Sequence, residues 1–423
     1  MGRLGVHFAR VEPLAQAGKY VRGLMSDLPR KNCWTLAEYV GDRTPDRMQR
    51  LLDRASWDTF AAMATVREFV VEHLVGDGLT VLVLDESGDE KTGTATCGVK
   101  RQYVGCAGKV ANAVNFVNVT YSSPRGHALV GSRLYVPAEQ LANDAQRTAM
   151  GIPSDLEFKT KPQLGRDLLA DAVTAGVPVS WCTADAVYGR DRELREYCEQ
   201  HTIGYALGLP CSFRVTLPSR AKVRVDATRK ILTSHSWQIA SCGPGSKGER
   251  RYAFAWLATA RPRHFLLIRR SLSNPTEVAY FFCFVPAHVP ATLGVLVAVC
   301  GRRWTVEEDH EFGKDQFGFD QSQARLYNPI MRHIVLVMAA LAICAVTTAH
   351  SRAHTDPLPT PTSRTQPPPD DIGLIPLTVV EIKKLFNLLT RAWRTVDHYL
   401  HWSQWRRRHQ ARARWYHHRA RLT

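Results

Sequence analysis

The spacing of apolar residues divides the chain into a helical part and a part rich in strands. Up to about residue 76, apolar residues recur every three or four positions, as along Val11 to Leu24 and Thr35 to Val40, and Thr44-Pro45-Asp46 is a typical helix start. From Leu79 to Pro210 short apolar runs predict strands, with one helix from about Lys161 to Ala175. This order predicts an α/β fold with a helical N-terminal domain.

An aspartate follows each of two predicted strands. Asp85 stands at the end of the apolar run from Leu79 to Leu84, and Asp185 stands at the end of Val177 to Ala184. A single aspartate after a strand is commonly a turn residue or a helix N-cap, and that interpretation stays open for each. Aspartates at the ends of two neighbouring strands can also gather around a hard cation, if a third carboxylate joins them.

A third carboxylate lies in a later helical segment together with two cations. At about 100° per residue, Glu307 lies about 40° round from Arg303, and Lys314 lies about 20° from Arg303, so all three share one helix face. A glutamate can bind a divalent ion while the cations contact the phosphate oxygens of a nucleic acid. The alternative is a solvated helix face with ion pairs.

Other carboxylates compete for the same role. Glu308 points about 100° away from Glu307, whereas Glu311, at about 40°, is the substitute for Glu307. Glu86 directly follows Asp85 and is the third competitor.

These motifs together resemble the DDE transposases of bacterial insertion sequences. The resemblance rests on the arginine, glutamate and lysine described above and on four further pieces of sequence: Asp85-Glu86-Ser87-Gly88, Lys91-Thr92-Gly93, Gly98-Val99-Lys100-Arg101-Gln102-Tyr103 and Ala184-Asp185-Ala186-Val187-Tyr188-Gly189. It extends from about Arg10 to the C-terminus and keeps the order Asp, Asp, Glu. One departure is Cys300, which stands where the family has a tyrosine, three positions before the arginine.

The resemblance implies a ribonuclease-H-like mixed sheet with flanking helices. The expected parts are a helical N-terminal DNA-binding domain (1–76), the first part of the core (77–210), a β-rich insertion (211–288), the second part of the core with the glutamate helix (289–350), a Pro/Thr-rich linker (351–373) and a basic C-terminal DNA-contacting segment (374–423). The N-terminal helices have an alternative role as a cap that packs on the core.

Alternating apolar and polar residues between Cys211 and His288 are the basis for the predicted insertion. The resemblance implies that it contacts the DNA end near the cleavage site. Trp237 and Trp256 are candidates for stacking on an extruded base, with a place in the core as the alternative.

The expected function is that of a transposase, which cuts transposon ends and joins them to target DNA. Two Mg²⁺ ions, with Mn²⁺ as a substitute, bound by Asp85, Asp185 and Glu307 would activate water and stabilise the leaving 3′ oxygen. The freed 3′ hydroxyl would then attack target DNA at the same site. Arg303 and Lys314 would contact phosphates. The alternatives are a nuclease without strand transfer and a catalytically silent DNA-binding regulator.

Charge agrees with a polyanionic partner. The chain of 423 residues has a net charge of +16, and the segment from Leu374 to Thr423 has 11 Lys+Arg and two acidic residues, which gives +9. Within it Arg406, Arg407 and Arg408 stand among tryptophans, so they are expected to contact the phosphates of double-stranded DNA. A charged tail without a fixed partner is the alternative.

Composition also bears on the compartment. The N-terminus lacks the apolar core of a signal peptide, and ten scattered cysteines without a CxxC pair argue for reduced thiols and against a zinc site. The longest apolar run, Ile334 to Val346, is short for a membrane span and predicts a buried helix. We therefore expect a cytoplasmic protein, and the resemblance implies that it is bacterial, associates with the nucleoid and acts as a homodimer on DNA.

Overall fold

The computed structural model describes residues 1–104, 108–245, 248–356, 359, 362–363 and 365–422. The chain forms two compact units, one made of Met1–Val66 and Glu311–Thr423 and the other of Arg67–His310. Helices α4 (Thr59–Leu74) and α11 (Trp304–Phe317) each cross a boundary between the units.

The first unit is helical, as expected for the N-terminal part. It contains η1 (Gly2–His7), α1 (Val11–Leu24), α2 (Cys33–Val40), α3 (Asp46–Asp53), α12 (Tyr327–Ala353), α13 (Val379–Thr390) and α14 (Val396–Arg419). Asn32 begins α2 with a capping box, and α12 packs against α1, α3 and α13. The first unit therefore combines both ends of the chain, which the expected domain order did not include.

Helix α12 contains the apolar run from Ile334 to Val346. The helix is 27 residues long, which is enough to cross a membrane by length and composition. Our length argument against a membrane span was therefore wrong, because the helix continues beyond the apolar run at both ends. Most of its side chains are nevertheless buried inside the protein, which agrees with the predicted core helix.

The basic C-terminal segment forms two helices, and its aromatic residues pack on the first unit. Trp402 of α14 is fully buried, and its indole nitrogen donates a hydrogen bond of 2.9 Å to the carbonyl of Asp42. Trp405 lies edge-on to Trp34. The beginning of α14 is thus a packed part of the unit. Of the expected linker, residues up to Ala353 belong to α12, and residues 357–358, 360–361 and 364 lie outside the described residues.

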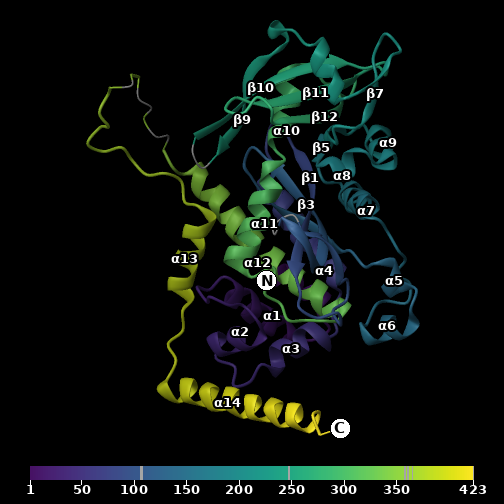
Figure 1. Cartoon of the computed structure of the whole chain (residues 1–423). Helices are drawn as coiled ribbons and strands as arrows, with labels where there is room; N and C mark the ends of the chain where they lie inside the picture. Colours follow the sequence, from purple (N-terminus) through teal and green to yellow (C-terminus); the bar gives the residue numbers. More distant parts are fainter. Residues whose placement is uncertain (105–107, 246–247, 357–358, 360–361, 364, 423) are drawn as a thin grey trace. The chain divides into compact units, whose positions relative to one another are not determined.

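The second unit is built around one mixed sheet (Figure 1), which has ten strands within the described residues. Its strands are β1 (Val81–Glu90), β2 (Lys100–Val104), β3 (Lys109–Ser123), β4 (Gly126–Leu134), β5 (Trp181–Ala184), β6 (Gly204–Leu209), β9 (Gln238–Gly245), β10 (Gly248–Ala258), β11 (His264–Ser271) and β12 (Val278–Phe284). A separate hairpin is formed by β7 (Arg214–Thr216) and β8 (Lys222–Arg224).

The order of the first strands confirms the predicted fold class. Strands β4, β3, β1, β5 and β6 are neighbours in that order, with β1, β5 and β6 parallel and the other pairings antiparallel. This is a ribonuclease-H-like mixed sheet, in which antiparallel hairpins come first along the chain and parallel strands follow.

Helices cover both faces of the sheet. The helices α7 (Lys161–Thr174), α8 (Ala186–Gly189) and α9 (Arg192–Gln200) lie on one face, and α10 (Leu293–Gly301) packs against β5, β6, β9 and β10 on the other (Figure 1). Val81 and Val83 of β1 belong to the core under α10, whereas Leu84 lies near Gly165 of α7. A strand covered on both faces needs apolar residues at every position, which explains the continuous run. Two short helices, α5 (Ala138–Leu141) and α6 (Asp144–Ala149), precede α7.

The segment 211–288 is rich in strands, but it does not fold apart from the core. Strand β12 pairs with β6, and β11, β10 and β9 extend the sheet further. Two 3₁₀ helices, η3 (Asp226–Ile231) and η4 (Ser234–Ser236), lie between β8 and β9. Trp256 packs against the core cluster and stacks with Phe265, while Trp237 is half-buried beneath the guanidinium of Arg270.

Candidate active site

Asp85 lies within β1 and not at its end. The strand continues to Glu90 because β3 pairs with it along its whole length, whereas the parallel pairing with β5 stops at Leu84. The prediction that Asp85 ends the strand was therefore wrong for the pairing with β3, which continues beyond it. It was right for the pairing with β5, which stops one residue earlier. Alternation places Asp85 on the same face as Val81 and Val83, toward α10 and the start of α11.

Asp185 directly follows β5, the strand that is parallel to β1 and next to it. Leu84 pairs with Ala184 in parallel register, so the two aspartates occupy the next aligned positions, with neighbouring strands about 4.8 Å apart. Asp185 is also the N-cap of α8, because its side chain accepts a hydrogen bond of 2.8 Å from the backbone N–H of Val187. The N-cap interpretation is thus correct for Asp185, and it fixes the orientation of the carboxylate.

Two glycines bring α8 against β6 and so set the position of Asp185. A Cβ atom on Gly189 would lie 1.8 Å from the carbonyl oxygen of Gly208, and a Cβ on Gly208 would meet the backbone of Asp185 at 2.9 Å. Neither position accepts a side chain without moving the backbone. Glycine in the motif Ala184 to Gly189 therefore permits the close approach that holds the aspartate.

Arg303 joins the carboxylates. It lies in the turn between α10 and α11, because its N–H bonds to the carbonyl of Cys300, and the helix begins only at Trp304. The expectation of one continuous helical stripe from Arg303 was therefore wrong. The guanidinium nevertheless pairs with Glu307 four residues later and lies 3.5 Å from Oδ2 of Asp85.

The electrostatics of this group reflect burial and mutual repulsion. Burial, with smaller contributions from Asp185 and Glu86, raises the pKa of Asp85 to about 7, although Arg303 opposes the shift. The pKa of Asp185 is also raised, chiefly by burial and then by Glu86. Burial alone would lower the pKa of Arg303, but Glu307, Asp85 and Asp185 raise it. Burial and the neighbouring carboxylates therefore disfavour the charged forms of both aspartates, and Arg303 opposes this effect.

The residues fit a divalent metal by donor chemistry. Within the described part of the chain, no three His, Cys, Asp or Glu side chains are gathered as a metal-binding group. The guanidinium of Arg303 is in contact with both Asp85 and Glu307, so one cation already reaches both carboxylates. Three carboxylates that all interact with Arg303 are a suitable oxygen set for Mg²⁺.

The competing carboxylates have other partners. Glu86 forms an ion pair of 3.0 Å with Lys161 of α7. Glu308 pairs with His127 at 3.3 Å, in agreement with its expected direction away from Glu307. Glu311 is exposed and belongs to the first unit.

Cys300 belongs to the core. It belongs to α10 and is buried in the cluster that also contains Cys242 and Cys283, and burial raises the pKa of its thiol to about 12. A neutral buried thiol can neither bind phosphate nor stack on a base, so the contact that a tyrosine could supply at this position is absent from this side chain.

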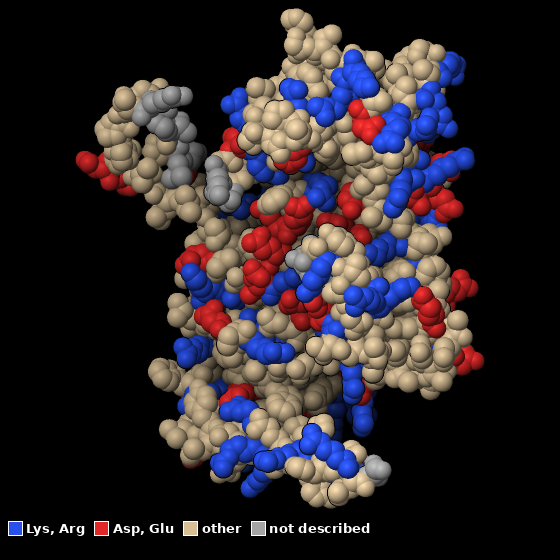
Figure 2. Space-filling model, viewed as in Figure 1, with Lys and Arg blue, Asp and Glu red and all other residues tan. Residues whose placement is uncertain are grey.

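The predicted phosphate-contacting residues lie in different settings. Lys314 is half-buried on α11, in the first unit. Arg406 is paired with Glu38, whereas Arg407 and Arg408 are exposed on α14. The segment 211–288 has 13 Lys+Arg and three acidic residues, a net charge of +10 that the sequence interpretation overlooked. Figure 2 shows basic side chains spread over the strands of this segment.

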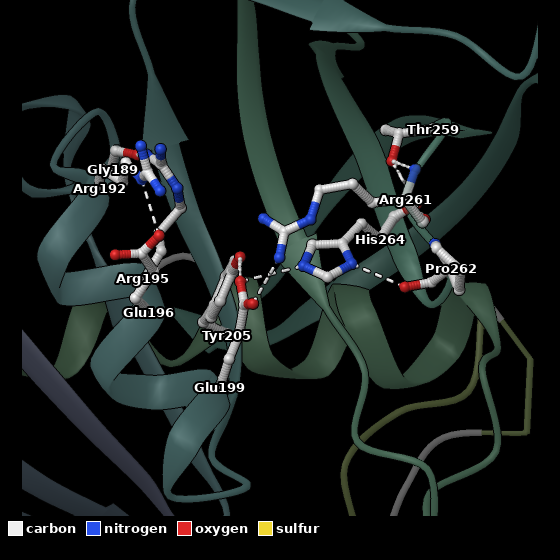
Figure 3. A network of polar contacts seen from close by, with 10 residues as sticks. All are labelled: Gly189, Arg192, Arg195, Glu196, Glu199, Tyr205, Thr259, Arg261, Pro262 and His264. Carbon is white, nitrogen blue, oxygen red and sulfur yellow. Dashed lines mark hydrogen bonds and ion pairs between the residues drawn. The ribbon is translucent and has the colours of Figure 1, made fainter.

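A second polar network lies between α9 and the β10–β11 turn (Figure 3). Glu199 accepts hydrogen bonds from Tyr205 at 2.8 Å and from Arg261 at 2.6 Å, and its carboxylate is 3.0 Å from Nε2 of His264. Nδ1 of His264 is 2.7 Å from the carbonyl of Pro262. Both ring nitrogens of His264 therefore face oxygen atoms.

Sequence reasoning also missed a polar cluster behind Glu307. Asp309 is almost fully buried and lies 2.9 Å from Nδ1 of His127. Burial alone would lower the pKa of His127, but Asp309 and Glu308 raise it to about 9. The available signal was the row of polar residues in β3, such as Asn118 and Thr120, within an otherwise apolar buried strand.

Comparisons with known proteins identify the family of this chain. The family described as DDE superfamily endonuclease matches residues 4–230, which include both aspartates and end before Glu307. A probable transposase for insertion sequence element IS701 of Microchaete diplosiphon is 26% identical over 284 residues, covering 63% of this chain and 70% of that protein.

Among solved structures, the piggyBac transposase synaptic complex with hairpin DNA is similar, with a TM-score of 0.46 and 10% identity, covering 90% of this chain and 71% of that chain. Since the family match spans more than half of its length, the chain belongs to the DDE superfamily of endonucleases, as the resemblance predicted.

Proposed function

We propose that this endonuclease is an insertion-sequence transposase, which cuts the ends of its element and joins them to target DNA. The observation that carries the proposal is the contact of one guanidinium with Asp85 and Glu307, beside the aligned Asp185. The similarity to the IS701 protein supports the transposase activity.

The proposed roles follow from the positions of the side chains. Asp85, Asp185 and Glu307 would bind two Mg²⁺ ions, which would supply activation of the attacking hydroxyl and charge stabilisation of the leaving 3′ oxygen. The three carboxylates are half-buried, so only part of each is open to solvent. The hydrogen bond from Val187 to Asp185 and the ion pair of Arg303 with Glu307 keep these two side chains oriented. Arg303 has a planar guanidinium suited to a bidentate phosphate contact, and Lys314, on α11, would supply a second cation.

The proposed partner is double-stranded DNA, both the inverted-repeat ends and the target. Two basic segments, 211–288 with +10 and 374–423 with +9, have the charge to bind its phosphates. Transposition needs two ends at once, so we also propose that a homodimer assembles on DNA, in the bacterial cytoplasm at the nucleoid.

The test uses labelled DNA that contains the element's ends and a supercoiled target. Asp85→Asn and Glu307→Gln should each lower cleavage by at least about 100-fold while DNA affinity is kept, because a metal ligand is lost with little change in shape. Glu193→Gln, at an exposed carboxylate of α9 that is paired with Arg166, is the matched control and should cleave normally. Near-normal cleavage by Glu307→Gln would remove Glu307 from the proposed site.

The same assay separates the two alternatives. A transposase yields cut ends and joined products, whereas a nuclease without strand transfer yields cut ends alone. A catalytically silent regulator binds the ends and yields neither product at any Mg²⁺ or Mn²⁺ concentration.

A further inference from the structure

Three consecutive residues after Glu307 anchor α11 to the sheet. Nδ1 and Nε2 of His127, on β4, face Asp309 at 2.9 Å and Glu308 at 3.3 Å. On β3, Asn118 donates a hydrogen bond of 3.0 Å to the ring of His310.

The Asp309 carboxylate is the centre of this cluster. Its side chain is 1% exposed, and its second oxygen accepts a hydrogen bond of 2.7 Å from the hydroxyl of Thr120, which is fully buried. Because both nitrogens of His127 face carboxylates, the ring carries two protons and a positive charge. A buried charge pair that also satisfies its other hydrogen bonds has one well-defined geometry, and loss of one partner leaves an unpaired buried charge.

The cluster fixes the rotation of the helix. Asp309 lies about 200° round the helix from Glu307, so the two carboxylates point to nearly opposite sides. An anchor on one side therefore determines the direction of the other side. The contact of His310 is with Asn118 on strand β3, and Asn118 lies directly opposite Asp85 in the antiparallel pairing of β3 with β1. A short path of buried contacts thus connects the orientation of Glu307 to the strand that carries Asp85.

We propose that His127, through its contacts with Asp309 and Glu308 and with the support of Thr120, is a positioning residue that holds the Glu307 carboxylate in register with Asp85 for binding a divalent cation. This inference rests on the proposed function, because it assumes that Glu307 binds the metal. Side chains that orient metal ligands typically change metal affinity by about 10–100-fold when they are removed.

The test measures Mn²⁺ binding to the full-length, DNA-free protein by calorimetry and the Mn²⁺ concentration that gives half-maximal cleavage. His127→Phe keeps the ring and removes both contacts, so we expect about tenfold weaker Mn²⁺ binding and a parallel rise in the half-maximal concentration. DNA affinity should stay unchanged. His127→Gln keeps a donor toward Asp309 and should restore part of the affinity.

His264→Phe is the matched control, because it removes a histidine that faces a carboxylate in the same unit but outside the site. It should lower thermal stability without a change in Mn²⁺ affinity. If His127→Phe does not fold, Thr120→Val replaces it, since this change removes one hydrogen bond at equal size and should weaken Mn²⁺ binding by about threefold.

Two outcomes separate the positioning role from the proposed function. Weak Mn²⁺ binding by Glu307→Gln with normal binding by His127→Phe and Thr120→Val overturns the positioning role alone. Normal Mn²⁺ binding by Glu307→Gln overturns the assignment of Glu307 as a ligand and the inference with it.

Discussion

At the residue scale, the site shows how burial decides the charge of each group. Burial and the neighbouring Asp185 disfavour the charged form of Asp85 and raise its pKa, and the guanidinium of Arg303 opposes this shift. His127 is the opposite case, because two carboxylates favour its charged form. The titration of both groups should make the stability of this unit depend on pH. The direction of the dependence is clearest for His127.

We expect the charged form of His127 to stabilise the folded protein at neutral pH. Its folded pKa of about 9 lies above the ordinary value of 6.5, so the stabilisation is complete below about pH 6.5 and is lost as pH rises through 9. The loss should be roughly 1–3 kcal/mol, since one pKa unit corresponds to about 1.4 kcal/mol.

Urea unfolding of the wild type and of His127→Phe at pH 6.5 and pH 9 measures this effect. The difference in unfolding free energy between the two proteins should shrink at the higher pH. An equal difference at both pH values would show that His127 contributes by packing alone.

At the element scale, close backbone contacts place the carboxylates. Helix α8 can approach β6 only because Gly189 and Gly208 lack side chains. Helices α10 and α11 meet at a turn that presents Arg303 to β1, and Gly301 permits this turn because a Cβ there would lie 2.6 Å from the carbonyl oxygen of Cys242. Glycines at these close contacts therefore help to set the positions of Asp185 and Arg303.

Gly189→Ala should impair cleavage through a shift of Asp185. The new methyl group cannot fit at 1.8 Å from an oxygen, so α8 must move, at a cost of roughly 1–3 kcal/mol in stability. We expect cleavage to fall by more than tenfold at a temperature where the variant is folded. Gly294→Ala, in the open first turn of α10, is the control and should be neutral or slightly stabilising. Full activity of a folded Gly189→Ala variant would show that this close contact is not needed to position Asp185.

At the scale of the whole molecule, some residues of the C-terminal helix α14 pack on the protein, whereas other, charged residues are exposed. Trp402 and Arg406 face the first unit, while Arg407 and Arg408 are exposed. Deletion of the helix would therefore remove buried packing together with charge, and single substitutions are the better test of DNA binding.

Arg407→Ser and Arg408→Ser should each reduce the slope of log K against log salt by about 0.9, if each arginine binds one phosphate. Arg406→Ser, the neighbour already paired with Glu38, should change the slope less. Affinity for a DNA duplex between 50 and 300 mM salt, on the order of the physiological range, measures the slopes. Equal slopes for the wild type and the three variants would indicate that the segment 211–288, and not these arginines, contacts the phosphates.

The sequence by itself determined the local elements and the chemistry of the candidate site residues. Apolar periodicity predicted α1 and α7 at nearly their observed bounds, since core-facing positions repeat with the period of the element. The order of Asp85, Asp185 and Glu307 also indicated the family, because carboxylates that share a cation must be of the right type at fixed places along the fold. Cysteine and charge counts added only coarse limits.

Only the tertiary structure decided which distant residues meet. The extension of β1 beyond Asp85 depends on its partner β3, and the joining of β9–β12 to the core sheet depends on the pairing of β12 with β6. The burial of Trp402 against the first unit and the anchor from His127 to Asp309 connect residues about 360 and 182 positions apart. Periodicity reports the face that a residue occupies within its own element, and it contains no information about the element that covers that face.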